Sequence, residues 1–493
     1  MNDTLRNLRF WLVVLTFIIL AIFKLHGYDR MPQTSHAEEL LYGWSGIHLI
    51  ETGVPVSWST LDYPKENIVF DGIVGDPSNV YLPATLYKPW LDEPPLYSLL
   101  SGGVAHLYGD DRWDVLPVSH TRIPSVLASL VTTILIFFVG NSFFGYGTGL
   151  LAMIIYGLSP IMVFGSRLSV PENIIAMAVM IGLLLAKKYK KKPETGIAVI
   201  FGVITVILGL MKPTGFFFAP LAMFLVAQKK RWKDFWLIGG LMFVGILLFL
   251  AYGYWLDWDM FLEIVRIQGG RFAGWSGLGH IFTSPAFDIF LMFDGWYIFC
   301  MISALFWGIK GKGKIGLKLI NLFFFYWLMV TLLSGTEGDL LPWYRYPLFP
   351  LLAVYGALGL KWIYKNINLL GLTLVIGMLL SSRYYLHNAF RPTTPTIVYR
   401  LSFCLGLLPL LLNKIWPKKL FIKISRGVVI VVVALGLFFN AKYIYSVFEI
   451  RCESIECPFG PSTKLSEVYM PVFWRWFVMK DPTGMLDENR PWF

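Results

Sequence analysis

The chain has 493 residues, of which 56% are hydrophobic and 17% aromatic, while only 15% are charged. A soluble domain carries about 25% charged residues, so this composition excludes a soluble globular protein and indicates an integral membrane protein. A net charge of +11 would suggest nucleic acid as a partner of a soluble protein. Here the basic residues stand in short blocks between hydrophobic stretches, so we exclude nucleic acid.

The first hydrophobic stretch, residues 9–25, follows two arginines as a secretory signal would. No small-x-small cleavage site follows it, and we therefore predict a retained first span. Hydrophobic stretches long enough to cross about 30 Å of hydrocarbon as helices recur along the chain. We predict an all-α polytopic membrane protein with about thirteen transmembrane helices, near residues 9–25, 122–140, 147–165, 171–186, 196–211, 214–228, 235–255, 286–309, 317–334, 346–360, 367–383, 397–413 and 427–446.

Five basic blocks separate these spans, and cytoplasmic loops are enriched in Lys and Arg. An even number of predicted spans lies between each successive pair of blocks, which places all five on one side. We predict a plasma or inner membrane protein with a cytoplasmic N-terminus and an extracytoplasmic C-terminus. Residues 1–446 form one multi-span domain, with a first outer loop at 27–121 and a short outer tail at 447–493. The blocks are 187–192, 229–233, 310–318, 361–365 and 414–426.

The first outer loop predicts two short helices and an irregular segment. Residues 37–53 suit an amphipathic helix that lies along the outer membrane surface and stops at Gly53. Residues 54–89, rich in Pro, Asp and Gly, predict an irregular loop. Pro94 and Pro95 then start a helix over 96–107 that is too short to cross the membrane, so we place it at the interface.

Four cysteines are too few for a disulfide scaffold. Cys300 and Cys404 lie inside predicted spans and serve as small apolar side chains. Cys452 and Cys457 lie in the outer tail, where an oxidising compartment favours a local disulfide. A metal site needs more ligands than this tail contains.

Acidic and basic side chains gather on the predicted outer side. Inverting sugar transfer needs a carboxylate that deprotonates the acceptor hydroxyl and cations that hold the departing phosphate. The carboxylates are Glu38, Glu39 and Glu172, and the basic candidates are Lys212, Arg271 and Arg345.

Each of these residues also has a structural interpretation. A single loop carboxylate is most often only solvated, and Glu172 follows Pro171 as a first-turn carboxylate matching a helix dipole would. Lys212 and Arg345 flank spans, where basic side chains reach for the interface, and His280 suits a structural role better than a catalytic one. The functional interpretation rests on several groups converging on one side.

Several strings, in order along the chain, resemble those of the C-type superfamily of lipid-linked-sugar glycosyltransferases. The resemblance is strongest to the branch of protein O-mannosyltransferases and lipid A aminoarabinose transferases, and it covers best about residues 1–230. The strings are Glu38-Glu39-Leu40-Leu41-Tyr42 with Thr52-Gly53, Glu93-Pro94-Pro95-Leu96, Arg122-Ile123-Pro124-Ser125, Ser159-Pro160 with Ser166-Arg167 and Glu172, Lys212-Pro213-Thr214-Gly215, and Arg345-Tyr346-Pro347 with Pro350.

The resemblance implies an enzyme that transfers a sugar from a polyprenyl-phosphate donor, with inversion, to an acceptor on the outer face. Glu38 takes the position of the family's catalytic Asp, with Glu39 and Glu172 as supporting acidic positions. Tyr42, Pro94 and Pro95 support the site, and Arg167 pairs with Glu172 to hold its turn. Lys212, Arg271 and Arg345 are the candidates for binding the donor phosphate.

Two positions depart from the family pattern. Glu38 is one methylene longer than Asp, so the base sits differently or Glu39 takes over its role. Glu93 replaces the Lys that precedes Pro-Pro in the aminoarabinose branch. The phosphate contact then comes from elsewhere, with Lys88 as a candidate, or the Asp92-Glu93 pair binds a divalent cation to which His280 could add a ligand. No cofactor is required by the sequence.

The competing function is a transporter or flippase for a lipid-linked or small solute. Transporters tend to show paired repeats, broken spans and ionisable residues near the midplane. Here the acidic groups lie in outer loops, apart from Asp288 and Asp294 near an outer span end. Oligosaccharyl transfer to asparagine is disfavoured because the chain contains no Trp-Trp-Asp motif. The sugar, its carrier and the acceptor, whether a protein, a lipid glycan or a polymer, are not specified by the sequence.

Overall fold

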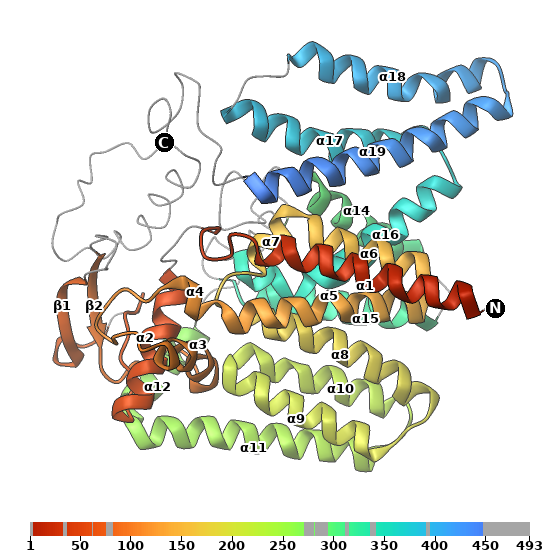
Figure 1. Cartoon of the computed structure of the whole chain (residues 1–493). Helices are drawn as coiled ribbons and strands as arrows, with labels where there is room; N and C mark the ends of the chain where they lie inside the picture. Colours follow the sequence, from red (N-terminus) through yellow and green to blue (C-terminus); the bar gives the residue numbers. More distant parts are fainter. Residues whose placement is uncertain are drawn as a thin grey trace.

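A computed structural model describes residues 3–32, 37–61, 63–74, 82–270, 281, 294–310, 315–335, 342–390 and 395–446. Long helices run side by side through the molecule, with the N-terminus at one end (Figure 1). Helices α2 (Ala37–Thr52), α3 (Pro95–Tyr108), α4 (Val118–Thr121) and α12 (Trp258–Gly269) gather at the opposite end with strands β1 and β2.

Every predicted span overlaps a helix of the structure. By length and composition, seven helical segments of the described residues suffice to cross a membrane, and five shorter apolar helices accompany them. This confirms the polytopic helical fold class, while the number of crossings stays a prediction. The helices are α1 (Asp3–Leu25), α5 (Ile123–Phe144), α6 (Tyr146–Leu158), α7 (Pro160–Gly165), α8 (Glu172–Lys191), α9 (Thr195–Met211), α10 (Phe218–Ala227), α11 (Trp232–Leu256), α14 (Gly295–Lys310), α15 (Ile315–Leu333), α16 (Phe349–Lys365), α17 (Leu369–Phe390), α18 (Thr396–Ile415) and α19 (Lys419–Ser446).

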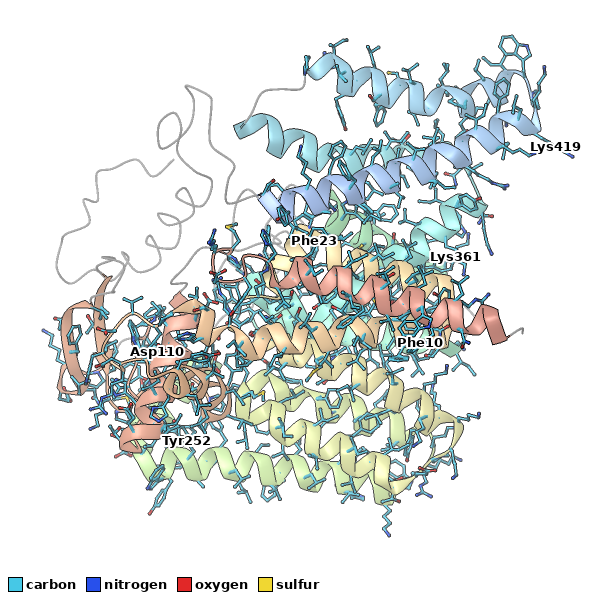
Figure 2. The ribbon with its side chains drawn as sticks, viewed as in Figure 1. Phe10, Phe23, Asp110, Tyr252, Lys361 and Lys419 are labelled. Atoms are coloured by element: carbon cyan, nitrogen blue, oxygen red, sulfur yellow. The ribbon has the colours of Figure 1, made fainter. Side chains whose placement is uncertain are left out.

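The two ends of the bundle differ in the way that the predicted topology requires. Lys361 and Lys419, from two of the basic blocks, lie at the end that holds the N-terminus (Figure 2). Asp110, from the first outer loop, lies at the other end. We refer to the end with α2, α3 and the strands as the loop end, and its extracytoplasmic orientation stays a prediction.

Helix α2 begins and ends close to its predicted bounds, but it is not a surface helix. Its residues from Glu39 to His48 are buried on all sides, because α2 crosses α3 through glycines. A Cβ atom on Gly46 would lie 1.9 Å from the carbonyl oxygen of Ser98, and one on Gly102 would lie 2.6 Å from that of Gly43. The predicted amphipathic character of this helix is therefore wrong, while its position relative to the membrane stays a prediction.

Helix α3 confirms the short helix predicted after the two prolines. Pro94 is its N-cap in an extended conformation, and Gly109 ends it with a φ of 82°. A left-handed φ suits glycine at a helix end because glycine has no Cβ.

The segment 54–89, predicted to be an irregular loop, contains regular structure. It holds a short 3-10 helix, η1 (Lys65–Asn67), and an antiparallel pair of strands, β1 (Ile68–Val74) and β2 (Leu82–Tyr87). In this pair Phe70 lies opposite Leu86 and Gly72 opposite Ala84. The sequence of β1, Ile-Val-Phe-Asp-Gly-Ile-Val, lacks the apolar and polar alternation that indicates a strand, which is why the sequence analysis missed it.

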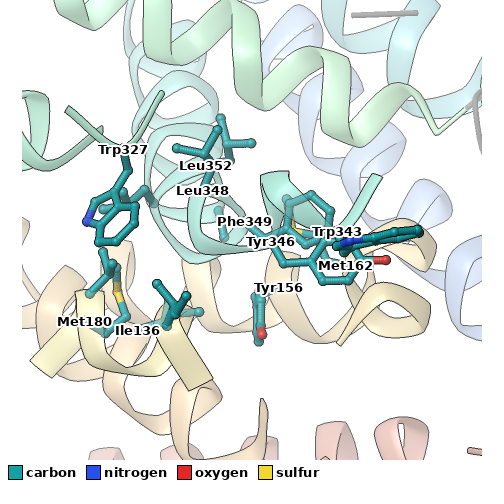
Figure 3. Packing of buried hydrophobic residues seen from close by; sticks show 14 of the residues in the cluster. Ile136, Tyr156, Met162, Met180, Trp327, Trp343, Tyr346, Leu348, Phe349 and Leu352 are labelled. Atoms are coloured by element: carbon teal, nitrogen blue, oxygen red, sulfur yellow. The ribbon is translucent and has the colours of Figure 1, made fainter. Parts of the chain in front are cut away.

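The centre of the bundle is α16, which follows the 3-10 helix η4 (Pro342–Leu348) and is buried along most of its length. Figure 3 shows Leu348, Phe349 and Leu352 of this segment among side chains of neighbouring helices, such as Ile136 and Trp327. This packing fixes η4 against the start of α8, where the candidate site begins.

The cysteines inside the described residues are free thiols. Cys300 is buried, while Cys404 is exposed on the outside of its helix, so only Cys300 fills the protein interior. Cys452 and Cys457 lie outside the described residues.

Candidate active site

Glu39 is bound entirely by the protein. Its side chain is fully buried, and Arg122 at the start of α5 approaches both carboxylate oxygens, at 2.7 and 2.8 Å. The backbone N–H of Ser169 donates a third hydrogen bond, at 2.8 Å. Glu39 therefore joins α2 to α5 and to the loop before α8, and the idea that it takes over as base is not supported by this geometry.

Arg167 also has a structural role, but with other partners than expected. Its guanidinium donates hydrogen bonds to backbone carbonyls at the end of α1 and just beyond, including Phe23 and His26 at 2.7 Å and Met31 at 2.9 Å. These carbonyls have no partners within the helix. The prediction that Arg167 pairs with Glu172 is wrong, because Arg167 is committed to α1.

Glu172 instead pairs with Lys212. The Nζ atom of Lys212 lies 2.6 Å from Oε1 of Glu172 and 3.7 Å from Oε1 of Glu93. Half-buried Glu38, in the first turn of α2, acts electrostatically on both Glu93 and Lys212. We call Glu38, Glu93, Glu172 and Lys212 the charged cluster. It joins four segments that are far apart in the sequence.

The Lys-Pro-Thr-Gly string explains how Lys212 reaches the cluster. Helix α9 ends at Met211, Lys212 is extended at φ −158° and ψ 137°, and Pro213 starts the 3-10 helix η2 (Pro213–Phe217). A Cβ atom on Gly215 would lie 2.3 Å from backbone atoms of Leu208, so this sharp turn requires glycine. The Lys212 ammonium also lies 4.6 Å from the centre of the Tyr344 ring.

Glu93 is directed into the cluster by its neighbour Asp92. The hydroxyls of Ser59 and Tyr63 donate to the two carboxylate oxygens of Asp92, at 2.5 and 2.7 Å. Asp92 therefore fixes the first outer loop, whereas Glu93 faces an ammonium, and a cation site at this pair stays a prediction. Within the described residues no group of three or more metal-ligating side chains occurs, and His280 lies outside them.

The cluster contains buried polar atoms that no hydrogen bond satisfies within the described residues. These atoms are Oε2 of Glu93, Oε2 of Glu172 and the hydroxyl of Tyr42. Burial raises the pKa of Glu93 and the ammonium of Lys212 lowers it, while Glu38, Glu172 and Asp92 raise it, and together these effects bring the pKa to about 8. Because buried polar groups are nearly always paired, these atoms indicate a site built for a ligand.

A cavity of about 370 Å³ opens beside the cluster, and Glu93, Lys212 and Tyr344 line it. Its other walls come from α11, α12, η2 and the end of α15, and they are largely apolar. Such a cavity, with a few polar groups at one point, is typical of a ligand site. The apolar wall residues are Leu91, Phe217, Phe249, Ile264, Val330 and Leu333.

Other predicted site residues lie away from this cavity or outside the described residues. Arg345 in η4 is fully buried and acts electrostatically on Tyr297 and Tyr346, but it does not line the cavity. Lys88 is exposed at the end of β2 and does not line it either. Arg271 is outside the described residues.

Two residues of the site escaped the sequence analysis. Arg122 stood in a family-like string, yet nothing in the string indicated that its partner is Glu39. Tyr344 precedes Arg345 and was overlooked because aromatic residues are abundant in this chain.

Asp294, noted in the sequence near an outer span end, has a structural role. Its carboxylate accepts hydrogen bonds from Ser159 and from the backbone N–H groups of Ile161 and Trp296, at the starts of α7 and α14.

Comparison with known proteins supports this assignment of the fold. Residues 92–255 match the family model described as dolichyl-phosphate-mannose-protein mannosyltransferase. No curated protein sequence matches the chain.

Among solved structures, ArnT from Cupriavidus metallidurans bound to undecaprenyl phosphate superposes with a TM-score of 0.52 at 13% identity, over 90% of this chain and 78% of ArnT. The arabinosyltransferase EmbB from Mycobacterium smegmatis gives a TM-score of 0.56 at 12% identity, over 96% of this chain and 43% of EmbB. Both are C-type glycosyltransferases, so the chain has the fold of that superfamily, as the motifs predicted.

Proposed function

We propose that this chain is a membrane glycosyltransferase that moves a sugar from a polyprenyl-phosphate-sugar donor to an acceptor on the extracytoplasmic face. The observation that carries the proposal is the position of Lys212, which lies among carboxylates at the edge of a cavity with apolar walls. The family model and the undecaprenyl phosphate bound to ArnT support a lipid-linked donor.

The reaction is a single displacement. A carboxylate takes the proton of an acceptor hydroxyl, the acceptor oxygen attacks the anomeric carbon, and the bond from that carbon to the phosphate oxygen breaks. The configuration at the anomeric carbon inverts. The departing polyprenyl phosphate gains one negative charge, which a preformed cation stabilises.

Glu38 is the base in this proposal. Glu39, its neighbour, is saturated by Arg122, and Glu172 is held by Lys212 at 2.6 Å. Glu38 lies in the first turn of α2, half-buried and electrostatically coupled to the cluster.

Lys212 stabilises the leaving phosphate, and Glu172 orients it. The lysine is 5% exposed, and a buried ammonium acts on a phosphate more strongly than one in water. The apolar walls near it, such as Phe217 and Phe249, suit the first isoprene units of the carrier. Arg345 and Arg271 stay candidates for a second phosphate contact, and a hexose, a pentose or a mannose-like sugar fits this chemistry equally.

The test is consumption of radiolabelled polyprenyl-phosphate sugars by the protein in lipid nanodiscs, with and without a crude acceptor fraction. Wild type should transfer label from one donor, and Glu38→Gln should lower kcat by about 10²- to 10⁴-fold, the usual contribution of a general base. Glu51→Gln is the matched control, because Glu51 lies at the other end of α2 and pairs with Arg112.

Full activity of Glu38→Gln would contradict the base assignment. If wild type consumes no donor but moves a lipid-linked or small solute across the bilayer, the chain is a transporter and the proposal fails.

A further inference from the structure

The charged cluster holds more negative charge than Lys212 can balance. With both groups ionised, Glu93 and Glu172 share the one ammonium that lies within 4 Å of them in the described part of the chain, that of Lys212. A polyprenyl-phosphate sugar brings one further negative charge on its phosphodiester. Because uncompensated charge in a buried site is strongly unfavourable, the donor must bind together with a positive charge.

Glu93 is the group of the cluster best placed to take up that charge as a proton. The ammonium of Lys212 lies 2.6 Å from Glu172 and 3.7 Å from Glu93, so it balances the charge of Glu172 more strongly than that of Glu93. Oε2 of Glu93 has no partner within the described residues. Glu93 lines the cavity beside Lys212, so its carboxyl group and the lysine face the same ligand.

We propose that Glu93 binds the donor phosphate as a neutral carboxylic acid and donates a hydrogen bond to it from Oε2. This inference rests on the proposed function. Both residues then bind the phosphate. Lys212 contributes its positive charge, and protonated Glu93 contributes a hydrogen bond. Glu93 is a donor-binding residue in this scheme, while Glu38 remains the base.

The titratable groups around Glu93 in the described part of the chain come from four segments. Glu38 and Tyr42 face it from α2, Glu172 from α8, and Lys212 from the end of α9, while Asp92 is its neighbour in the chain. Burial favours the protonated form and Lys212 opposes it, while Glu38, Glu172 and Asp92 favour it as well. The pKa of about 8 describes the site without donor, and an incoming phosphate raises it further.

The protonation of Glu93 makes the KM for the donor depend on pH. Below pH 8 Glu93 is already protonated, so the donor binds without taking up a proton and KM is constant. Above pH 8 each binding event takes up a proton, and KM for the donor should rise about tenfold per pH unit.

The experiment measures KM for the accepted donor between pH 7 and 9.5 in nanodiscs, in wild type, Glu93→Gln and Glu263→Gln. Glutamine donates a hydrogen bond at every pH, so the KM of Glu93→Gln should stay flat up to pH 9.5, and this pH dependence rather than the size of kcat is the readout. Glu263 is an exposed carboxylate on α12 that pairs with Arg266. Glu263→Gln should keep the wild-type rise and shows that the effect belongs to Glu93.

Three results would overturn the inference. The first is a wild-type KM that does not change with pH, and the second is a rise that persists unchanged in Glu93→Gln. The third is turnover at pH 7 that EDTA abolishes and a divalent cation restores, with Glu93→Gln inactive at every pH although it unfolds at the wild-type temperature. In that case a metal ion supplies the charge. If wild type consumes no donor at all, it is the proposed function that fails.

Discussion

The loop end contains two clusters of buried charge that lie close together and differ in kind. In the first, Glu39 and Arg122 are both fully buried, and each carboxylate oxygen of Glu39 receives a hydrogen bond from the guanidinium. In the second, Lys212 lies between Glu172 and Glu93, and each of these carboxylates has a buried oxygen that finds no hydrogen-bond partner among the described residues. Glu93 and Lys212 line the cavity of about 370 Å³, whereas Glu39 and Arg122 are not part of its lining.

This difference separates a structural ion pair from a binding site. A buried pair whose hydrogen bonds are all made inside the protein leaves nothing for a ligand, and its removal exposes an uncompensated charge. A cluster with unpaired atoms beside a cavity gains its missing partners only when a ligand enters. Substitutions at Glu39 or Arg122 should therefore lower the stability of the protein, whereas substitutions in the charged cluster should lower its turnover of donor.

The largest effect should follow from Arg122→Gln. This substitution leaves the Glu39 carboxylate buried without its cation, and it also removes the hydrogen bond from Arg122 to the carbonyl of Tyr28. We expect the free energy of unfolding, measured by SDS titration in mixed micelles, to fall by about 3 to 5 kcal/mol. Unchanged stability would contradict the assignment of Glu39 and Arg122 as a structural ion pair.

Lys212→Gln should instead reduce activity. The loss of the cation that stabilises the leaving phosphate should lower kcat by about 10²- to 10³-fold, as when one transition-state donor is removed. Stability should fall less than in Arg122→Gln, because Glu93 and Glu172 can take up protons when the lysine is gone. The measurements are donor turnover and SDS titration of the same preparation, and a folded, fully active variant would exclude Lys212 from the reaction.

A smaller effect is expected from Gly102→Ala at the crossing of α2 and α3. The added Cβ would lie 2.6 Å from three backbone atoms of α2, which cannot move aside singly. Overpacking of this kind costs about 1 to 3 kcal/mol. Because Glu38 and Glu93 depend on these two helices, turnover should also decrease.

The neighbouring glycine provides the control. A Cβ atom on Gly103 would make only an ordinary contact of 3.6 Å, with the Ile50 side chain. Gly103→Ala should therefore be neutral or stabilise α3 by up to about 1 kcal/mol through helix propensity. Equal loss of stability in both alanine variants would show that the close crossing is not what positions the loop end.

The positions of the helices along the chain could be predicted from the sequence, because a membrane span depends on the length and apolarity of a single segment. Strings with family-like spacing also pointed to Glu38, Glu172 and Lys212, which lie together in the structure, while their catalytic roles stay predictions. The start of α3 at Pro95 followed from the stereochemistry of proline.

Long-range packing set the limits of the prediction. Glu38 and Glu39 are adjacent in the chain, and only the position of Arg122 on a distant helix decides which of them is saturated. The burial of α2 depends on Gly46 and Gly102 meeting across two helices, which no pattern within α2 reveals. Arg167 was assigned to the wrong partner for the same reason.

The attachment of α1 to Arg167 has a consequence for the order in which the protein is made. The carbonyls at the end of α1 precede the arginine that binds them by about 140 residues. At a synthesis rate of roughly 5 to 20 residues per second, the first helix waits some 7 to 30 s for this partner. During that interval its end depends on water or on the insertion machinery, so the first helix reaches its final position only after the start of α8 has been synthesised.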